Sequence, residues 1–399
     1  MKFAIITHVQ HIKSDNYYFG YAPYIREMNI WLRHVNEVIV VAPIVHKELN
    51  PIYEQYHHSN LRFCKVSEFN ITTVSNVFIA LFKLPKVFST VYSAMSQADH
   101  IHLRCPGNMG LIGALVQILF PKKTKTAKYA GNWDPKAKQP FTYKLQRWIL
   151  SNTFLTKNMQ VLVYGGWDNQ TKNIKPFFTA TYSESEILNL EFRIQNEWSL
   201  RAESRTTEKS LDSARLDKIE IDLPPTSFLF VGTLSKGKQP LYAIQLVEAL
   251  CRQGKKVQLD LYGEGVLRTD LERYISENKL ENIISLKGNQ SKETVLKAYQ
   301  SSHFLILPSK SEGWPKVVAE AMFWGCVPIA SPVSCVSYMM GNGSRGVILQ
   351  EELNQDVDQI EAVISKQEVY QKMASEGQTW SRQFTTDKFE AEIKKLLRG

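Results

Sequence analysis

The sequence has 399 residues, which is too long for one compact core and fits two domains of ordinary size. Hydrophobic residues make up 44% of it and charged residues 22%, a composition that excludes a disordered or fibrous chain. The formal charge of +9 is uneven, because residues 1–186 carry 21 Lys and Arg against 11 Asp and Glu.

The sequence lacks the signals of a membrane-spanning or exported chain. No uncharged apolar run reaches about 18 residues, so we expect no transmembrane helix. The opening MKFAIITHVQ has one charge and a short apolar run, which predicts a first strand. No small-residue cleavage site follows it, so we expect no signal peptide. The five cysteines lack CxxC spacing and are odd in number, which favours reduced thiols in a cytoplasmic protein.

In chain order, the N-terminal half alternates short β-rich runs with helical patterns. Residues 7–23, between the first strand and the first helix, are expected to form a loop. The predicted strands are 3–7, 37–43, 61–66, 100–104, 126–131 and 161–165, and the predicted helices are 22–34, 74–97, 109–120 and 141–157.

The C-terminal half shows the same alternation more clearly. Charged, Ser- and Thr-bearing residues at 187–225 break the pattern and predict an inter-domain connection. The alternation predicts a parallel sheet wrapped by helices. The predicted strands are 227–232, 257–262, 283–288, 303–308 and 327–330, with helices from Pro240 to before Gly254, within 266–280, within 291–302 and at the chain end.

The most informative segment is PSKSEGWPKVVAEAMFWG, residues 308–325. A strand ends at Pro308, a loop carries Glu312 and Gly313, and Pro315 stands where a helix begins. A helix that opens after a strand presents backbone N–H groups and a favourable dipole to anions, so it suits a diphosphate. Glu320, on the same helix, is placed to accept hydrogen bonds from a ribose diol.

Two further loops follow strands of the same predicted sheet. GTLSKGK, residues 232–238, brings Lys236 and Lys238, and Gly263-Glu264-Gly265 follows the next strand. Each loop alone is better interpreted as a solvated loop. The carboxyl ends of parallel strands share one edge, where ligands bind in open α/β sheets, so the three loops together predict a nucleotide site.

Residues 227–349 resemble the donor domain of the retaining group 1 glycosyltransferases. The family pattern runs through FVGTLSKGK, LDLYGEGVLRTDLE, the segment ending PSKSEGWPKVVAEAM, GCVPIASPVSCVSYM and RGVIL. Glu312 and Glu320 reproduce the family's two glutamates separated by seven residues.

The resemblance implies an α/β protein of GT-B architecture, with two Rossmann-like parallel-sheet domains facing a cleft. It implies an N-terminal acceptor domain (1–186), the connection, a donor domain (226–379) and a C-terminal helix (380–399) that crosses back to the N-terminal domain. The implied activity transfers a hexosyl or N-acetylhexosaminyl group from a nucleotide sugar, with UDP favoured over GDP, and retains the anomeric configuration.

The resemblance also implies roles for single residues. Lys238, with Lys236 as the alternative, offsets the donor diphosphate, and Glu312 lies beside the donor sugar; Lys238 and Glu312 are therefore the catalytic candidates. Glu320 holds the ribose, and Gly288 and Asn289 lie where the base edge is read. The donor-binding set is Gly232, Lys236, Lys238, Gly263, Gly288, Asn289, Glu312, Gly313, Trp314, Pro315, Lys316, Val317 and Glu320.

The sequence departs from the family in three places, the first of which is that Gly131-Asn132-Trp133-Asp134 replaces the histidine often found after the strand ending near Ala130. Thr233 stands where an arginine commonly follows the glycine of FVG, and the paired-glycine acceptor loop is absent from the first segment. Acceptor-side candidates are therefore chosen for their place at predicted strand ends or in that first segment: Gly20, Arg104, Gly131, Asn132 and Asp134.

Chemistry without a metal or other cofactor is expected, because Lys238 and the helix start near Gly313 can stabilise the leaving diphosphate. Asp356-Val357-Asp358 matches an acid-x-acid metal motif in form, but it lies in a helical pattern and is interpreted as a solvated helix start. His8 and His11 are interpreted as a cleft or surface loop rather than as a metal-ligand pair.

Two other functions stay open. A nucleotide-sugar epimerase or a phosphorylase uses the same fold, although no cofactor-anchoring lysine motif supports a phosphorylase. A basic RNA- or glycan-binding protein is the alternative of another class, but no interleaved aromatic and basic strand residues indicate nucleic acid as a partner.

The basic N-terminal half suggests either an acidic partner or ordinary solvated lysines. Its densest cluster is Lys122, Lys123, Lys125 and Lys128. An anionic membrane face and a phosphorylated acceptor both suit such a charge. With the family's habits, this favours a glycan or lipid-linked glycan acceptor in bacterial polysaccharide or lipopolysaccharide synthesis. The expected location is cytoplasmic, with peripheral attachment to the inner face of the plasma membrane through Lys83, Lys86 and the apolar run around them.

Overall fold

A computed structural model describes residues 1–50, 52–67, 74–188 and 225–398, without the side chains of residues 74–82. The chain divides into two compact units. Unit 1 comprises Met1–Thr179, Glu312–Trp314 and Phe389–Gly399, and unit 2 comprises Ala180–Ser311 and Pro315–Lys388. Most of the predicted connection, residues 189–224, lies outside the described residues.

Unit 1 is built on a seven-stranded sheet in the order β10-β9-β8-β7-β1-β4-β6, in which every neighbouring pair is parallel. The chain moves outward from β1 on one side and then returns to β7 on the other, so the topology switches between β1 and β7. The strands are β1 (Lys2–Ile6), β4 (Glu37–Pro43), β6 (Leu61–Val66), β7 (His100–Cys105), β8 (Thr124–Tyr129), β9 (Met159–Tyr164) and β10 (Ile174–Phe177).

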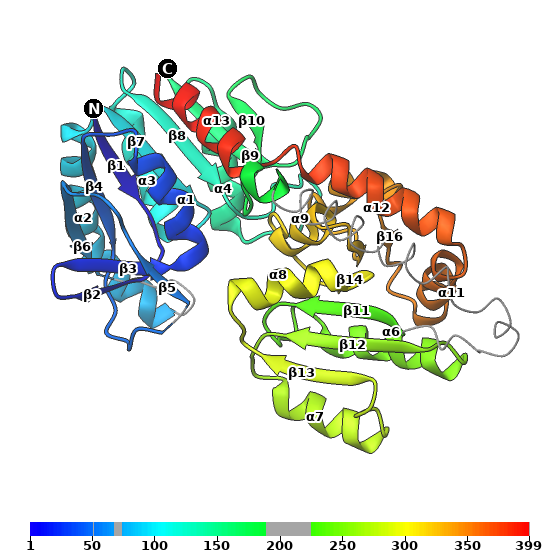
Figure 1. Cartoon of the computed structure of the whole chain (residues 1–399). Helices are drawn as coiled ribbons and strands as arrows, with labels where there is room; N and C mark the ends of the chain where they lie inside the picture. The colour runs from blue at the N-terminus through cyan, green and yellow to red at the C-terminus, as the bar shows by residue number, and fades with distance from the viewer. Residues whose placement is uncertain (51, 68–73, 189–224, 399) are drawn as a thin grey trace, which may run out of the picture. The chain divides into compact units, whose positions relative to one another are not determined.

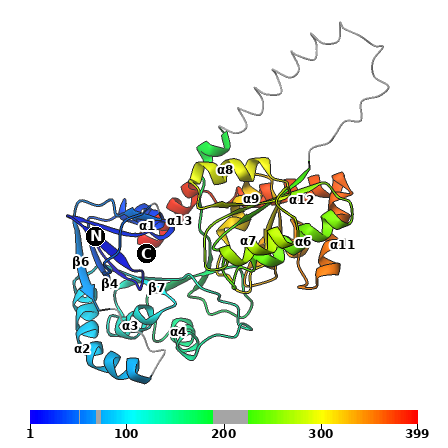
Figure 2. The same ribbon diagram turned by 90° about the horizontal axis from the view of Figure 1, so that it is seen from below.

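Helices cover both faces of this sheet, and this explains why its central strands β1 and β4 are almost continuously apolar. Ala4 and Ile6 face a core shared with α2, α3 and α4, whereas Phe3 stacks with Trp31 of α1 on the opposite face. Figure 2 shows α2, α3 and α4 side by side on one face. The helices are α1 (Ala22–Leu32), α2 (Val74–Gln97), α3 (Asn108–Val116) with the 3₁₀ turn η1 (Gln117–Leu119), and α4 (Phe141–Ser151).

A small antiparallel sheet replaces the loop predicted at residues 7–23. It consists of β2 (His11–Ser14), β3 (Tyr17–Tyr21) and β5 (Tyr53–Gln55), in the order β2-β3-β5. His11 is fully buried here and stacks on Tyr56. The prediction of a loop was wrong, because residues 11–14 pair with residues 17–20 across the Ser14–Tyr17 turn and Tyr18 stacks on Phe63.

Unit 2 is built on a six-stranded parallel sheet in the order β13-β12-β11-β14-β15-β16 (Figure 1). The five predicted strands of this half are confirmed to within one or two residues. They are β11 (Thr226–Val231), β12 (Val257–Tyr262), β13 (Ile284–Gly288), β14 (Phe304–Leu307) and β15 (Val327–Ala330), followed by β16 (Val347–Ile348).

The helices of unit 2 bury apolar stripes against this sheet. Leu246, Val247 and Leu250 of α6 lie in one core with Val357 and Ile360 of α11. The helices are α6 (Pro240–Arg252), α7 (Arg268–Glu277), α8 (Lys292–Ser301), α9 (Lys316–Phe323), α10 (Val336–Met339), α11 (Leu353–Ile364) and α12 (Gln367–Ser381).

The last helix, α13 (Thr386–Arg398), passes from unit 2 into unit 1 at Phe389, as the expected architecture requires. Phe389 and Ile393 are buried, and Phe389 lies 5.5 Å from Phe177, measured between ring centroids. Among the described helices, none has the length and apolar character needed to cross a membrane.

Candidate functional site

Glycines bring three loops of unit 2 together at the carboxyl edge of its sheet. A Cβ on Gly263, which has φ +140°, would lie 2.0 Å from the carbonyl oxygen of Gly232. A Cβ on Gly265 would lie 2.4 Å from the carbonyl oxygen of Leu234. Any side chain at these positions would separate the loops, so the predicted convergence of the loops after β11 and β12 depends on glycine.

The loop after β11 carries the two predicted lysines to this edge. It turns tightly, with the Lys238 amide donating to the Ser235 carbonyl at 3.0 Å. Gln239 takes a left-handed conformation as the N-cap of α6, and Pro240 begins the helix. Lys236 is exposed and Lys238 half-buried. The Lys310 amide donates to the Gly237 carbonyl at 2.9 Å, which ties this loop to the one after β14.

Helix α9 begins beyond the loop that follows β14. Pro315 is its N-cap and makes no side-chain cap, and Lys316 and Val317 are its first residues. By packing, Glu312, Gly313 and Trp314 are grouped with unit 1, where the Trp314 ring lies 5.7 Å from that of Tyr164.

Glu320 is held on both carboxylate oxygens. The Thr181 hydroxyl donates to Oε1 at 2.7 Å, and the Tyr299 hydroxyl donates to Oε2 at 3.1 Å. Burial raises the pKa of Tyr299 well above its ordinary value, and the Glu320 charge raises it further, so Tyr299 remains a donor. Sequence reasoning missed both partners, although a tyrosine on the buried side of a helical pattern needs a partner for its hydroxyl.

The remaining donor-side candidates lie at the end of β13. Gly288 has φ +67°, and a Cβ there would lie 2.9 Å from the Glu264 carboxylate. Asn289 follows it and is exposed. The Gly263 amide donates to the Gly288 carbonyl at 2.9 Å, so this third loop joins the same edge.

In unit 1, the topological switch lies between the carboxyl ends of β1 and β7. His8 follows β1, and a Cβ on Gly107, which follows β7, would lie 2.9 Å from its Nδ1 atom. Partial burial and the nearby Arg104 charge lower the pKa of His8, which favours a neutral imidazole. Ligands bind at such switch points in open parallel sheets, so the position of His8 makes it a candidate ligand contact that the sequence analysis left out.

Arg104, on β7, belongs to a largely buried charge network. Lys128 Nζ lies 2.6 Å from Glu27 Oε1, and Arg104 Nη1 lies 3.7 Å from the same oxygen. Lys128 is fully buried, with its ammonium within 5.4 Å of the ring centroids of Tyr164, Phe177 and Phe389.

The other acceptor-side candidates have structural roles. Gly20 is buried inside β3, where a Cβ would lie 2.9 Å from Ile25, and so it does not lie in a loop. A Cβ on Gly131 would lie 2.9 Å from Pro106. Asn132 Oδ1 accepts the Asp134 amide at 2.8 Å, and Asp134 Oδ1 accepts the Lys136 amide at 2.8 Å, so both side chains shape this loop.

The predicted basic cluster is not a continuous surface. Lys125 and Lys128 are buried, and burial lowers the pKa of Lys125 to about 8. Lys123 Nζ donates to the carbonyls of Met95, Ser96 and Ala98 at 2.6–2.8 Å. Sequence clustering misled here because β8 is a central strand whose lysines find partners inside the sheet layers.

Asp356 also differs from its interpretation as a solvated residue. It lies in the first turn of α11, as expected, but it is fully buried. Its carboxylate accepts the Tyr242 hydroxyl at 2.6 Å and the Gln350 amide at 2.7 Å, so it fastens α11 to α6.

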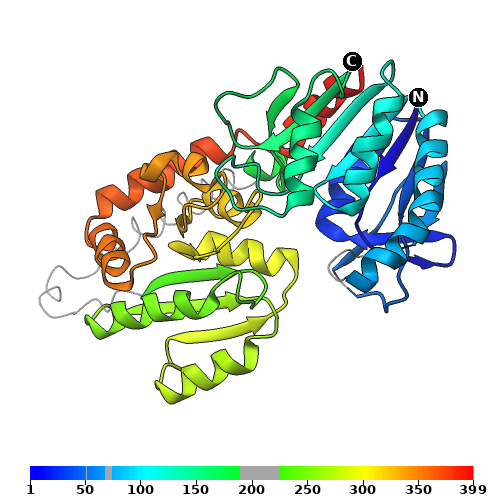
Figure 3. The same cartoon turned by 180° about the vertical axis from the view of Figure 1, so that it is seen from behind.

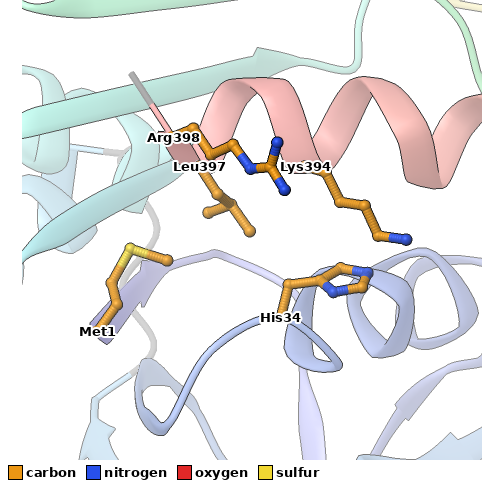
Figure 4. Close-up of a pocket in the computed structure, with 5 residues that line it drawn as sticks. All are labelled: Met1, His34, Lys394, Leu397 and Arg398. Carbon is orange, nitrogen blue, oxygen red and sulfur yellow. The ribbon is translucent and has the colours of Figure 1, made fainter.

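One hollow of unit 1 lies away from the carboxyl edge of the sheet of that unit. It is lined by Met1, His34, Lys394, Leu397 and Arg398, at the amino end of β1 (Figure 4). Glu390 pairs with His34 beside it at 2.8 Å. Because ligands of parallel sheets bind at the carboxyl ends of the strands, this hollow is distinct from the candidate site.

A family model described as glycosyl transferases group 1 matches residues 214–380. Alpha-D-kanosaminyltransferase of Streptomyces kanamyceticus is 26% identical over 147 residues, 37% of this chain and 38% of that protein. GDP-mannose:cellobiosyl-diphosphopolyprenol alpha-mannosyltransferase of Xanthomonas oryzae is 24% identical over 162 residues, 40% of this chain and 43% of that protein. The chain thus matches less than half the length of either relative.

Solved structures match over the whole chain. The Anabaena protein HepE in complex with UDP aligns with a TM-score of 0.65 at 13% identity, covering 100% of this chain and 99% of that one. Sucrose-phosphate synthase of Thermosynechococcus elongatus aligns with a TM-score of 0.64 at 17% identity, covering 100% and 98%. The fold is therefore the predicted GT-B fold, with two Rossmann-like parallel-sheet domains.

Proposed function

We propose that this protein is a glycosyltransferase that takes a sugar from a nucleotide-sugar donor bound at the carboxyl edge of unit 2. The observation that carries the proposal is the convergence of the glycine loops after β11, β12 and β13 on one edge, next to the start of α9. The family model covers this same part of the chain.

Different residues at this edge suit different parts of the donor. Lys238, or Lys236, and the start of α9 offer positive charge to the diphosphate, as helix N-termini do. Glu320, already oriented by Thr181 and Tyr299, has lone pairs left for the two ribose hydroxyls, because a carboxylate has about four acceptor sites. UDP is the favoured nucleotide, since HepE was solved with it.

The proposed reaction breaks the bond between the anomeric carbon and the diphosphate oxygen and forms a bond from that carbon to an acceptor oxygen. The acceptor proton passes to the departing diphosphate, and the new bond forms on the same face, which retains the configuration. Lys238 and the α9 amides would stabilise the charge that develops on the diphosphate. Glu312 would lie beside the sugar.

The proposed acceptor is a glycan or lipid-linked glycan held at the carboxyl edge of unit 1. His8 and Arg104 flank the switch between β1 and β7, where a hydroxyl-bearing ligand would meet a neutral imidazole. Asn132 and Asp134 occupy the neighbouring loop after β8.

The test is a thermal-shift screen of the whole protein against UDP-, GDP- and ADP-sugars, followed by transfer assays with the stabilising donor. We expect one nucleotide class to raise the melting temperature and to support transfer to a polyprenyl-diphosphate-linked glycan. Conversion of the donor to an epimeric nucleotide sugar in the absence of any acceptor would instead indicate an epimerase. Stabilisation by none of the nucleotides would refute the donor site.

A further inference from the structure

Large apolar side chains point to solvent from the helix layer formed by α2, α3 and α4 in unit 1. This layer lies in the foreground when the molecule is viewed from behind (Figure 3). Phe141 is 78% exposed, Trp148 60% and Phe154 75%, whereas Trp31 and Trp133 of the same unit are buried. Leu115 and Leu119 are exposed beside them, at 44% and 56%.

Helix geometry gathers these side chains on the outer side of the layer. Phe141 and Trp148 are seven positions apart on α4, and Lys144 lies between them on the same face. The opposite face of α4 carries Ile149, which packs in the core. Leu115 and Leu119 are four positions apart, on the outward side of α3 and η1.

Hydrogen bonds hold the tip of this surface in place. Asn152 Oδ1 accepts the amides of Phe154 and Leu155 at 3.0 and 3.1 Å, which fixes the turn after α4. Gln117 Nε2 donates to the Leu155 carbonyl at 3.1 Å, so this turn is fastened to η1. Phe154 is thus presented to solvent by an ordered turn next to Leu119.

The charge of these segments is of one sign. Residues 108–123 and 141–157 contain no Asp or Glu, but they contain Lys122, Lys123, Lys144, Arg147 and Lys157. Lys122, Lys144 and Lys157 are exposed, and Lys157 Nζ lies 5.1 Å from the centroid of the Phe154 ring. We call the set Leu115, Leu119, Phe141, Trp148 and Phe154, with these three lysines, the apolar-basic face.

We propose that the apolar-basic face docks on the surface of an anionic lipid bilayer. Exposed aromatic and leucine side chains gain by entering the headgroup region, and lysines around them gain from anionic lipids. A second copy of the chain fits poorly, because a two-fold interface would set this basic face against itself. The docking stands independently of the proposed function.

Docking would serve the proposed function through α4. Phe141 opens α4 directly after the loop that carries Asn132 and Asp134. Arg147 Nη1 donates to the Asp134 carbonyl at 3.0 Å, which ties α4 to that loop. If the proposed function holds, a lipid-linked acceptor would meet the acceptor side of unit 1 close to the bilayer.

The experiment is co-sedimentation of the whole protein with phosphatidylcholine vesicles, with or without about one third phosphatidylglycerol, at low and high salt. We expect sedimentation with the anionic vesicles at low salt and its loss at high salt. Trp148→Ser with Phe154→Ser, and separately Lys144→Gln with Lys157→Gln, should each weaken the partition about tenfold or more.

The matched controls make the same types of substitution at exposed positions outside the apolar-basic face. Tyr17→Ser with Val266→Ser removes exposed apolar groups, and Lys172→Gln with Lys175→Gln removes exposed lysines of unit 1. Both should bind vesicles like the wild type, and circular dichroism should show every variant folded. Wild-type protein that ignores anionic vesicles, face variants that bind normally, or controls that lose binding equally would each overturn the proposal. The proposal would also be overturned if the wild type formed a dimer that the face variants, but not the control variants, converted to a monomer.

Discussion

At the scale of single residues, Glu320 is set for binding before any ligand arrives. Thr181 and Tyr299 each donate to one of its oxygens, so its rotamer is fixed by partners from two other segments. A hydrogen-bond-accepting carboxylate that is already oriented loses little conformational freedom when a diol binds it. Glu312 has no such place in a helix, because it lies in the loop before α9.

We predict that Glu320→Gln weakens binding of the free nucleoside diphosphate by about 1–3 kcal/mol, the cost of a buried polar group losing its partner. Glu312→Gln should leave that affinity nearly unchanged and slow transfer about tenfold, which is ~1.4 kcal/mol. Interactions present in both states affect binding, whereas those made in the transition state affect turnover. Calorimetry and saturation kinetics on both variants test this, and equal losses of nucleotide affinity would contradict it.

We also predict that Tyr299→Phe weakens nucleotide binding by about 1 kcal/mol, because Glu320 loses one of its two donors. Tyr274→Phe is the matched control, since the Tyr274 hydroxyl donates to Glu248 at 2.7 Å, away from the glycine loops. Both variants should lose some thermal stability, but only Tyr299→Phe should change the calorimetric affinity. An unchanged affinity in Tyr299→Phe would show that Glu320 does not depend on it.

Motif spacing could predict the place of Glu320 but not its partners. Thr181 lies 139 residues away in sequence and carries no local pattern that points to it. For Lys128 the sequence pattern was misleading. Its three neighbouring lysines in the sequence suggested a basic surface, yet Lys128 is buried against Glu27. Burial of a charge is decided by distant partners, which sequence spacing does not reveal.

At the scale of elements, α13 closes one face of unit 1. Its buried Phe389 lies 5.1 Å, from ring centroid to ammonium, from Lys128 and contacts Phe177. Glu390, one residue on, bonds to His34 of the segment after α1. Burial alone would raise the pKa of Glu390, but His34, Lys394 and Arg33 lower it overall.

Phe389→Ala should destabilise unit 1 by about 3–5 kcal/mol, because a large buried ring is replaced by a cavity. Its loss also removes one of the rings around the Lys128 ammonium. Lys395→Ala, an exposed position on the same helix, should change stability by less than about 0.5 kcal/mol. Chemical denaturation followed by tryptophan fluorescence measures both, and similar midpoints for the two variants would contradict the prediction.

Elements with strong apolar patterns could be predicted from the sequence, and those stabilised by pairing could not. The five predicted strands of unit 2 are four to six residues long, largely apolar and bounded by turns, so their pattern is plain. The hairpin β2-β3 has a mixed polar and aromatic sequence, and its third strand β5 comes from residues far along the chain. The pairing of β3 with β5 therefore cannot be predicted from any short stretch of the sequence.

At the scale of the molecule, three buried histidines make unit 1 sensitive to acid. Burial lowers the pKa of His11 and of His100 to about 4, and that of His102 to about 3. The unfolded chain binds these protons at its ordinary pKa of about 6.5, so stability is complete above that pH and is lost as the pH falls towards 4.

Between pH 7.5 and 5.5, each histidine should therefore remove about 1.4 kcal/mol, or about 4 kcal/mol in all. Melting curves across this range measure the loss. His100→Gln should flatten the dependence, whereas His46→Gln, at an exposed position, should leave it unchanged. A melting temperature that stays constant from pH 7.5 to 5.5 would refute the prediction.

Transfer should continue in excess EDTA after desalting, because Lys238 and the α9 amides supply fixed positive charge to the diphosphate. The measurement is the rate of product formation with and without the chelator. Loss of activity that manganese or magnesium specifically restores would contradict it.

The division of unit 1 along the chain affects how it is made. Its sheet is complete by Phe177, but its buried Lys128 is covered in part by Phe389, which is synthesised more than 200 residues later. During translation, at roughly 5–20 residues per second, unit 1 therefore spends on the order of ten seconds or more without that cover. A chaperone that recognises exposed aromatic surface would meet its substrate in that interval.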